Sequence, residues 1–218
     1  MSRLIGALVF AYLLGSIPTG ILAGRLRGRI DIRDHGSGSS GGTNVARVLG
    51  WGPGIAVIAL DMLKGYLGAR IGTWLVGDNI GLQTEAVAAL AGVCVVLGHV
   101  FPVFARFRGG KGVAPAAGVL LAVEPAAFLV AAAIFLVLLG ASRIVSVASI
   151  GSSMGLFVVL SVLRWGAGWG ISGSLLVLSL SLSVIVTFAH RGNLARLTAG
   201  VEPALGRPAR GPKKPRSP

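Results

Sequence analysis

A glycine-rich stretch, HGSGSSGGTNVAR (residues 35–47), follows the first apolar segment of this 218-residue chain. Glycines can adopt positive φ and leave backbone N–H groups exposed, and successive amides of this kind form a concavity that suits a phosphate. Serine, threonine and asparagine side chains add donors, and Arg47 offers a planar guanidinium to the same anion. Glycine and serine also make flexible linkers, so the composition alone leaves an anion site and a flexible loop equally open. The residues that would bind phosphate are Gly36, Ser37, Gly38, Gly41, Thr43, Asn44 and Arg47.

A second candidate anion site is RFRGGKG, residues 106–112. The turn formed by Gly109, Gly110, Lys111 and Gly112 would open a helix and present an ammonium group and free N–H groups to an anion. It is not a nucleotide-binding P-loop, because glycine is absent five positions before Gly110 and no Ser or Thr follows Lys111 to bind magnesium. The sequence therefore argues against nucleotide hydrolysis. The alternative is a basic loop with helix-breaking glycines.

A third polar cluster, HRGNLARLTAGVE (residues 190–202), follows the last apolar segment. A histidine titrates near neutrality, so His190 is a candidate base or hydrogen-bond donor. Asn193 and Arg196 lie three and six residues further on and would share a helical face with it. The alternative is an amphipathic helix at the membrane surface, with its arginines directed toward lipid headgroups.

Two charged residues and one histidine lie in or beside apolar segments. Asp61 and Lys64 are spaced i, i+3, so they can pair and reduce the cost of burial, which predicts a structural salt bridge. His99 lies at the inner end of an apolar segment and is interpreted as an interfacial histidine rather than a catalyst.

Long apolar segments must position these clusters. The chain is 54% hydrophobic and only 12% charged, whereas soluble domains have roughly a quarter of their residues charged. Apolar runs of about 20 residues are long enough to cross a bilayer core of about 30 Å. The sequence therefore predicts an all-α, polytopic transmembrane helix bundle. Its clear spans are predicted at 4–24, 53–76, 85–105, 144–163 and 171–189.

The distribution of positive charge predicts the topology. The net charge of +13 does not indicate nucleic acid, because most basic residues lie beside the apolar segments, as they do in cytoplasmic loops. This places the N-terminus outside and the C-terminus in the cytoplasm. Region 113–141 must then cross twice or not at all, and Glu124-Pro125 interrupts it because proline starts helices but breaks their interiors. Two short helices give seven spans and a re-entrant hairpin gives five; we expect seven.

The chain is expected to have one membrane domain, residues 1–206, and a short tail, residues 207–218. The tail, RPARGPKKPRSP, is basic and proline-rich without an apolar pattern. Such a segment is expected to be disordered and attracted to anionic lipid headgroups.

These motifs together resemble the bacterial acyl-phosphate:glycerol-3-phosphate acyltransferases (PlsY) along nearly the whole chain. The first motif of that family has the form GSGN-x-GATN-x-x-R, and residues 36–47 are similar to it, with Ser39 in place of Asn and Gly42 in place of Ala. GSIPTG (15–20), LDMLKG (60–65) and GHVFPVFARFRGGKGVA (98–114) also follow the family pattern, although Pro115 stands where Thr is common. The residues that match the third motif are His190, Arg191, Asn193, Gly200 and Glu202.

The resemblance implies an integral enzyme of the bacterial cytoplasmic membrane with a seven-helix fold and a site on the cytoplasmic side. It would transfer a fatty acyl group from acyl phosphate to the sn-1 hydroxyl of glycerol-3-phosphate, without coenzyme A, a metal or another cofactor. Membrane lipids and the soluble enzyme that makes acyl phosphate are its expected partners. The implied catalytic residues are Ser37, Arg47, Lys111, His190 and Asn193, and the implied supporting residues are Asp61, Lys64, His99 and Glu202.

The chemistry implied by the resemblance fits these residues. Acyl phosphate is already activated, so the protein must chiefly position two anionic substrates and stabilise developing negative charge. The acceptor of the hydroxyl proton stays open between His190 and a phosphate oxygen of the donor. None of the three histidines has an aspartate five positions later, so the HxxxxD dyad of acyl-CoA-dependent glycerolipid acyltransferases is absent.

Two other functions are compatible with part of the sequence. A transporter for an anionic solute would use Asp61 and Lys64 at mid-depth, within halves related by a repeat. The polar clusters instead gather at one predicted face, and no second half mirrors the first. A noncatalytic scaffold would explain the basic tail but not three segments suited to anions.

Overall fold

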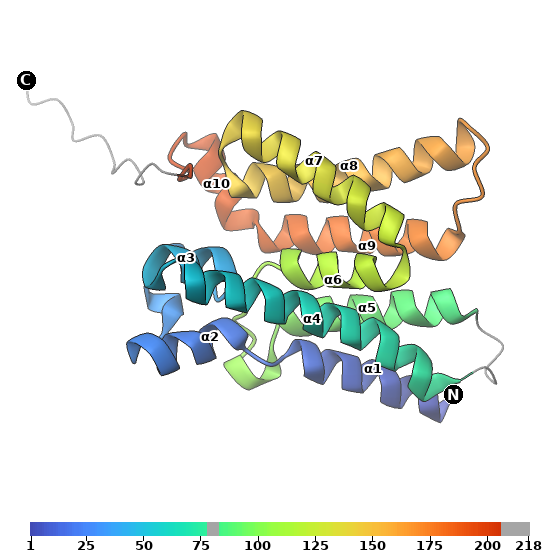
Figure 1. The fold of residues 1–218 in the computed structure, drawn as a ribbon, viewed down its shortest axis with the longest axis horizontal. Coiled ribbons are helices and arrows are strands. Elements are labelled where there is room, and N and C mark those ends of the chain that lie inside the picture. The colour runs from blue at the N-terminus through green and yellow to red at the C-terminus, as the bar shows by residue number, and fades with distance from the viewer. Residues whose placement is uncertain (78–82, 206–218) are drawn as a thin grey trace, which may run out of the picture.

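The computed structural model describes residues 1–77 and 83–205, and these residues form a bundle of helices (Figure 1). The segment 207–218, expected to be a disordered tail, lies outside the described residues. Seven helices run side by side through the bundle: α1 (Ser2–Gly15), α4 (Trp51–Val76), α5 (Thr84–Val100), α6 (Val113–Val123), α7 (Pro125–Ser142), α8 (Val145–Trp165) and α9 (Gly173–Ala189). The shorter elements are α2 (Thr19–Ala23), a π-helical turn Gly24–Gly28, a 3₁₀ turn Ile32–Asp34, α3 (Gly42–Leu49), a 3₁₀ turn Val103–Ala105 and α10 (Arg191–Thr198).

Several helices have the length and composition of membrane spans. Among the described residues, four stretches qualify: Ser2–Gly28, Thr84–Ala105, Pro125–Ser142 and Val145–Trp165. The pair α9 and α10, bent by 61°, makes a fifth if it is counted as one span, and α6 is apolar but shorter. Large apolar side chains of α7 and α8 are exposed, including Leu129, Leu136, Val137, Val158 and Val162. Such an exposed apolar surface is expected where lipid rather than water surrounds the helices.

The first predicted span, 4–24, lies within the candidate span Ser2–Gly28, but its helix is interrupted. Helix α1 ends at Gly15, and α2 starts at Thr19 after Pro18. Proline lacks an N–H and disfavours helical geometry in the residue before it, so the chain cannot continue straight through Ile17 and Pro18. The break leaves the carbonyl of Ile17 without its helical partner, and it accepts hydrogen bonds from Thr19 N at 3.0 Å and Lys64 Nζ at 3.0 Å instead.

The break predicted at Glu124-Pro125 is confirmed. Pro125 is the first residue of α7, where its missing N–H costs nothing, and the Glu124 carboxylate accepts a hydrogen bond from Ala126 N at 3.3 Å. The span predicted at 85–105 agrees with the candidate span Thr84–Ala105, within which α5 ends at Val100, two residues before Pro102, and a 3₁₀ turn follows. Residues 25–52 include the short helix α3.

Glycines allow the backbones of α4 and α6 to approach closely. A Cβ atom at Gly118 would lie 1.9 Å from the carbonyl oxygen of Met62, and one at Gly65 would lie 2.1 Å from that of Pro115. Helix packing in membranes relies on small residues of this kind, because contact between backbones replaces the hydrophobic driving force. Pro115, which departs from the family pattern, lies in the first turn of α6, where its N–H would have no helical partner.

Loops from distant parts of the chain meet at one end of the bundle. Helices α2, α3 and α10 all lie at this end, and the N-terminus of α1 lies at the other (Figure 1). Leu205 N donates to Arg143 O at 2.7 Å, so the α7–α8 turn also lies beside the last described residues. We call this end, formed by residues 25–50, 101–112, 142–145 and 190–205, the polar end.

The closest contact between α4 and α6 gives a stability prediction. Gly118→Ala should lower the free energy of unfolding by at least about 1–3 kcal/mol, because the two backbones must separate. Gly140→Ala is the matched control, since a Cβ there meets nothing within 4 Å and alanine favours helix by up to about 1 kcal/mol. Thermal unfolding midpoints in one detergent measure both, and equal midpoints for the two variants would contradict the packing argument.

Candidate active site

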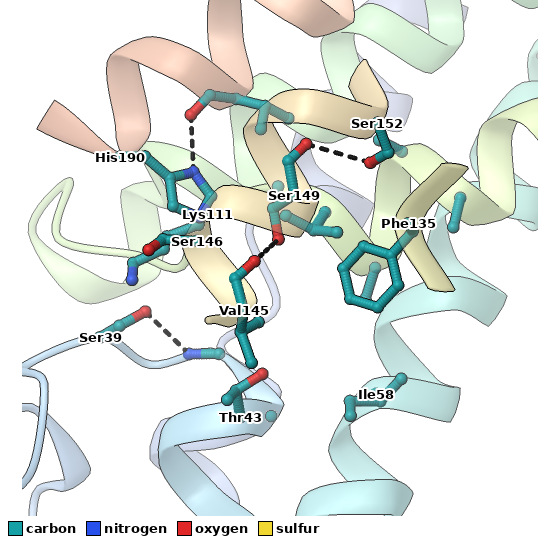
Figure 2. A pocket seen from close by; sticks show the side chains of 18 of the residues that line it. Ser39, Thr43, Ile58, Lys111, Phe135, Val145, Ser146, Ser149, Ser152 and His190 are labelled. Carbon is teal, nitrogen blue, oxygen red and sulfur yellow. Dashed lines mark hydrogen bonds between the residues drawn. The ribbon is translucent and has the colours of Figure 1, made fainter. Parts of the chain in front are cut away.

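One cavity of about 1000 Å³ connects the polar end with the interior of the bundle. Its polar part is lined by the glycine-rich loop, by Lys111 and by the residues after α9. Its apolar part is lined by α6, α7 and the inner turns of α8 and α9. Figure 2 shows Lys111, His190 and Ser146 on one side of this cavity, with Ser39 and Thr43 of the glycine-rich loop across from them.

Asn44 holds the glycine-rich loop in shape. Asn44 is 2% exposed, and the two hydrogens on its Nδ2 are shared among the carbonyl oxygens of Ile32, His35 and Ser39, at 3.1, 2.9 and 2.9 Å. Its Oδ1 accepts a hydrogen bond from Ser37 N at 2.8 Å. The amide of Asn44 is therefore fully engaged with the backbone, and its place in the site is to organise the loop rather than to contact an anion directly.

The conformation around Asn44 explains the first glycine of the motif. Gly36 has φ of +62°, and a Cβ there would lie 2.3 Å from Asn44 Oδ1. A side chain at this position would strain the backbone and push the Asn44 amide away from its partners. Gly38 also has positive φ, +73°. The glycines thus permit a rigid loop, which favours an anion site over the flexible linker.

The groups left available in this loop face the cavity. The hydroxyls of Ser37 and Thr43 line it and make no hydrogen bond with any described residue. Gly42 and Thr43 open α3, so their N–H groups have no intrahelical acceptor. Arg47, near the end of α3, is exposed, lines the same cavity and forms no ion pair within the described part of the chain. Donors and a cation therefore converge on one space.

The turn before α6 differs from the expectation that Gly109 and Gly110 bind an anion. Gly109 N donates to Val100 O at 3.2 Å and Gly110 N donates to His99 O at 3.1 Å, so neither N–H is available. A Cβ at Gly110 would lie 2.1 Å from His99 Nε2. These glycines fold the chain tightly back onto the end of α5, and this turn directs Lys111 into the cavity. Gly112, with φ of +80°, lines the cavity and opens α6.

A buried network connects the break after α1 to this turn. Asp61 is 1% exposed; its Oδ1 accepts a hydrogen bond from Thr19 Oγ1 at 2.6 Å and pairs with Lys64 Nζ at 2.9 Å. Lys64 Nζ also donates to Ile17 O at 3.0 Å, the carbonyl released by the break. His99 Nδ1 lies 3.5 Å from the same carboxylate oxygen. From the sequence we interpreted His99 as an interfacial histidine. In the structure it is instead buried against Asp61.

Arg33 joins the segment between α2 and α3 to the loop after α5. Its guanidinium pairs with Asp31 at 2.6 Å and donates to Ala105 O at 3.0 Å. The hydrogen bonds from Arg33 lower the pKa of the Asp31 carboxyl to about 2. The hydrogen bond from Arg33 to Ala105 O, rather than the ion pair, links the two segments.

Glu202 connects α8, α10 and the last described segment. Its Oε1 accepts hydrogen bonds from Ser146 Oγ at 2.8 Å and from Asn193 Nδ2 at 2.5 Å, and its Oε2 accepts one from Arg196 Nε at 2.7 Å. Asn193, expected to be catalytic, thus uses its amide N–H to hold Glu202. Burial would raise the pKa of the Glu202 carboxyl, but these three hydrogen bonds outweigh burial and lower it.

Burial shifts the pKa values of the two titratable groups beside Glu202. Burial, together with the nearby cations Arg196 and Arg47, lowers the pKa of Lys111 to about 8. Burial and the charge of Lys111 lower the pKa of His190 to about 4, so its imidazole is neutral at physiological pH. His190 Nδ1 lies 2.8 Å from Val186 O. A carbonyl can only accept, so Nδ1 carries the proton and Nε2 presents a lone pair.

Helix α8 contributes residues to the cavity that were not predicted from the sequence. Ser146, Ser149 and Ser152 line the cavity from this helix, and Ser146 holds Glu202. Serines three residues apart in an otherwise apolar segment were the available signal, because this spacing places hydroxyls on one helical face.

The arrangement can bind a phosphoryl group beside a neutral imidazole and accommodate an apolar chain in the same cavity. Among residues 1–77 and 83–205, no group of three or more His, Cys, Asp or Glu side chains could hold a metal ion. Fold and site together define a membrane protein that handles a substrate with an anionic head and an apolar tail.

Comparison with known proteins identifies the family. A family model described as glycerol-3-phosphate acyltransferase matches residues 5–200. Glycerol-3-phosphate acyltransferase of Chlorobium phaeobacteroides is 38% identical over 226 residues, covering 93% of this chain and 96% of the relative. That of Thermoanaerobacter pseudethanolicus is 41% identical over 198 residues, covering 91% and 93%. The chain belongs to the glycerol-3-phosphate acyltransferase family.

Solved structures agree with this assignment. A crystal structure of PlsY (YgiH), an integral membrane glycerol 3-phosphate acyltransferase, in its glycerol 3-phosphate form has a TM-score of 0.82 at 37% identity, covering 93% of this chain and 96% of that chain. The lysophosphatidic acid form of PlsY has a TM-score of 0.79 at the same identity. The resemblance inferred from the motifs is confirmed, and the chain is a multi-pass membrane acyltransferase of phospholipid synthesis. Membership of an enzyme family argues against the transporter and the scaffold.

The role of Asn44 gives a prediction for activity. Asn44→Ala should lower kcat/KM for glycerol-3-phosphate by about 10²-fold or more, because four backbone groups lose their partner and the loop loses its shape. His35→Ala is the matched control: it lies in the same loop, its exposed ring hydrogen-bonds to Asp31 O, and it does not line the cavity. Steady-state kinetics on monodisperse protein measure both. Activity of Asn44→Ala within twofold of the parent would show that this loop is not part of the site.

Proposed function

We propose that this chain transfers a fatty acyl group from acyl phosphate to the sn-1 hydroxyl of glycerol-3-phosphate, releasing lysophosphatidic acid and phosphate. The observation that carries the proposal is the single cavity, whose cationic end is continuous with an apolar end. An acyl phosphate needs both environments, one for its head and one for its tail. The forms of PlsY described above, one with glycerol 3-phosphate and one with lysophosphatidic acid, support the acceptor and the product.

In this mechanism Arg47 and Lys111 supply fixed positive charge to the phosphoryl groups. Arg47 is available for a planar, two-pronged contact, and Lys111 enters as a point charge from the turn before α6. The hydroxyl of Ser37, the side chain of Thr43 and the N–H groups that open α3 supply further donors. The N–H groups that open α3 are fixed by the helix before substrate binds, so they can stabilise developing negative charge without reorganisation.

The proton of the attacking hydroxyl goes to the leaving phosphate in this proposal, with His190 as the orienting group. The hydroxyl oxygen attacks the carbonyl carbon, the bond between that carbon and the phosphate oxygen breaks, and inorganic phosphate leaves. Neutral His190 can accept a hydrogen bond from the hydroxyl through Nε2. Its pKa of about 4 makes it a weaker base than a phosphate oxygen, whose second pKa is about 6.

We propose seven crossings of the bacterial cytoplasmic membrane, with the N-terminus outside and the site on the cytoplasmic side. Helices α1, α4, α5, α6, α7, α8 and α9 supply the crossings. The basic residues of the polar end support this orientation, because cytoplasmic loops carry an excess of Lys and Arg. The soluble enzyme that makes acyl phosphate would deliver its product to this same side, and no coenzyme A, metal or other cofactor takes part.

The donor can be tested in detergent micelles, which have no separate compartments. Purified protein with glycerol-3-phosphate and dodecanoyl phosphate should form lysophosphatidic acid, whereas dodecanoyl coenzyme A should give at least about 10²-fold less, because its bulky nucleotide head does not match the phosphoryl site. Mass spectrometry of the product measures both. Equal rates with the two donors would overturn the acyl-phosphate assignment.

The low pKa of Lys111 predicts an alkaline limb in the pH profile. Because the ammonium group is lost above pH about 8, kcat/KM for glycerol-3-phosphate should fall roughly tenfold for each further pH unit. Lys111→Arg keeps its charge and should remove the limb up to pH about 10, even if its rate is lower. The limb of kcat should lie at higher pH, since bound phosphate favours the charged lysine. An unchanged limb in Lys111→Arg would assign the titration to another group.

A further inference from the structure

We propose that three bulky side chains at the inner end of the cavity, Leu120, Phe128 and Leu156, set the longest acyl chain that the enzyme transfers. We call these three residues the floor. The inference rests on the proposed function, because it takes the acyl chain of the donor to lie in the apolar part of the cavity. It identifies residues that determine specificity and are distant from the reacting groups.

The cavity stops at a consistent depth on the helices that surround it. On α6 the lining residues start at Val113 and stop at Leu120, although the helix continues to Val123. On α8 they start at Val145 and stop at Leu156, although the helix continues to Trp165. On α7, which runs in the opposite direction, the innermost lining residue is Phe128.

The interior beyond the floor is packed. Leu160, one turn past Leu156 on the same helix, is 4% exposed and belongs to the same apolar core as Leu175 and Leu176 of α9. None of these three residues lines the cavity. Protein interiors are packed as densely as organic crystals, so this core leaves no continuation for a straight chain beyond the floor along α8 and α9.

The walls between the polar end and the floor carry mostly small side chains, which contrast with the bulky floor. They are Ala116 and Ala117 of α6, Ala131 and Ala132 of α7, and Ser149 and Ser152 of α8. Phe135 of α7 and Ile58 of α4 face the cavity from different sides, with Ser149 and Ser152 alongside (Figure 2). A slender, unbranched chain is the shape that such a channel admits.

The depth corresponds to a fatty acyl chain. Ser146 and Leu156 are ten residues apart on α8, which is about 15 Å at 1.5 Å per residue. A C–C bond is about 1.5 Å long. Because an extended alkyl chain zigzags, its length grows by less than this for each carbon. The cavity therefore holds somewhat more than about ten carbons between the glycerol site and the floor.

Selection at the floor should act on long chains only. A donor chain arrives from the membrane, where it is already in an apolar environment, so each added methylene gains little from burial in the protein. A chain that reaches the floor must bend or displace packed side chains, which costs as much as overpacking a core. Shorter chains meet no such obstacle, so the predicted chain-length profile has a sharp upper limit and a shallow lower one.

The experiment is a competition among saturated acyl phosphates of ten to eighteen carbons, mixed in equal amounts with glycerol-3-phosphate and the purified full-length protein in micelles. Mass spectrometry of the lysophosphatidic acids gives product ratios, which do not depend on how much of a variant is folded. Ser152→Leu places a bulky side chain one turn, about 5.4 Å, nearer the polar end. It should lower the upper limit by about four carbons, with at least about a tenfold loss for the excluded lengths relative to the shortest donor.

Leu156→Ala should shift the limit in the opposite direction, toward longer chains. Leu160→Ala is the matched control, because it removes the same atoms from the same helix face in the packed core and should leave the product ratios unchanged. Ratios that stay constant in both Ser152→Leu and Leu156→Ala would overturn the floor while leaving the proposed function intact, and so would a shift in Leu160→Ala equal to that in Leu156→Ala. Failure of the parent protein to use any acyl phosphate would instead overturn the proposed function.

Discussion

The polar end depends on satisfying backbone groups that are released inside a membrane. Pro18 breaks the first helix, and in an apolar environment each unsatisfied carbonyl costs several kcal/mol. Lys64 donates to the released carbonyl of Ile17, and Asp61 neutralises Lys64 while accepting a hydrogen bond from Thr19. The same carboxylate lies beside His99. The carbonyl of His99 accepts a hydrogen bond from Gly110 N, and its ring packs against Gly110, in the turn before Lys111. A single buried carboxylate thus joins a broken helix to the cation of the site.

The cavity reflects a second constraint, which the substrates impose. A phosphoryl group needs charge and hydrogen-bond donors, whereas a fatty chain needs an apolar surface, and both belong to one molecule. The protein meets these two needs with different parts of its sequence. Glycine-rich loops line the polar end of the cavity, and alanine-rich and serine-rich faces of α6, α7 and α8 line its inner part. The serines do not make these inner walls strongly polar, because the hydroxyls of Ser149 and Ser152 donate to carbonyls of their own helix.

The helices and the membrane class could be predicted from the sequence, because hydropathy and the Glu124-Pro125 break are local properties. The interruption of α1 was missed, since averaging hydrophobicity over 20 residues conceals a single proline. The three polar clusters were predicted from the sequence. Which of their donors are already hydrogen-bonded within the protein was not. Gly109 and Gly110 carry the composition of an anion loop, yet their N–H groups bond to the end of α5. Only the three-dimensional path of the chain determines which amides are free, and the same holds for Asn44, whose partners span residues 32–39.

The charges of the site explain why an anionic substrate binds where it does. Burial and the nearby cations Arg196 and Arg47 lower the pKa of Lys111, so these positive charges repel one another around the cavity. Glu202 is the internal counter-ion that offsets part of this cost, and Ser146 and Asn193 hold it at one edge of the cavity. A phosphoryl group that enters the cavity supplies the negative charge still missing, so part of its binding energy comes from relief of repulsion among groups already in place. A site strained in this way binds a dianion more strongly than a neutral glycerol, and this preference follows from the geometry of the cations without any movement of the fold.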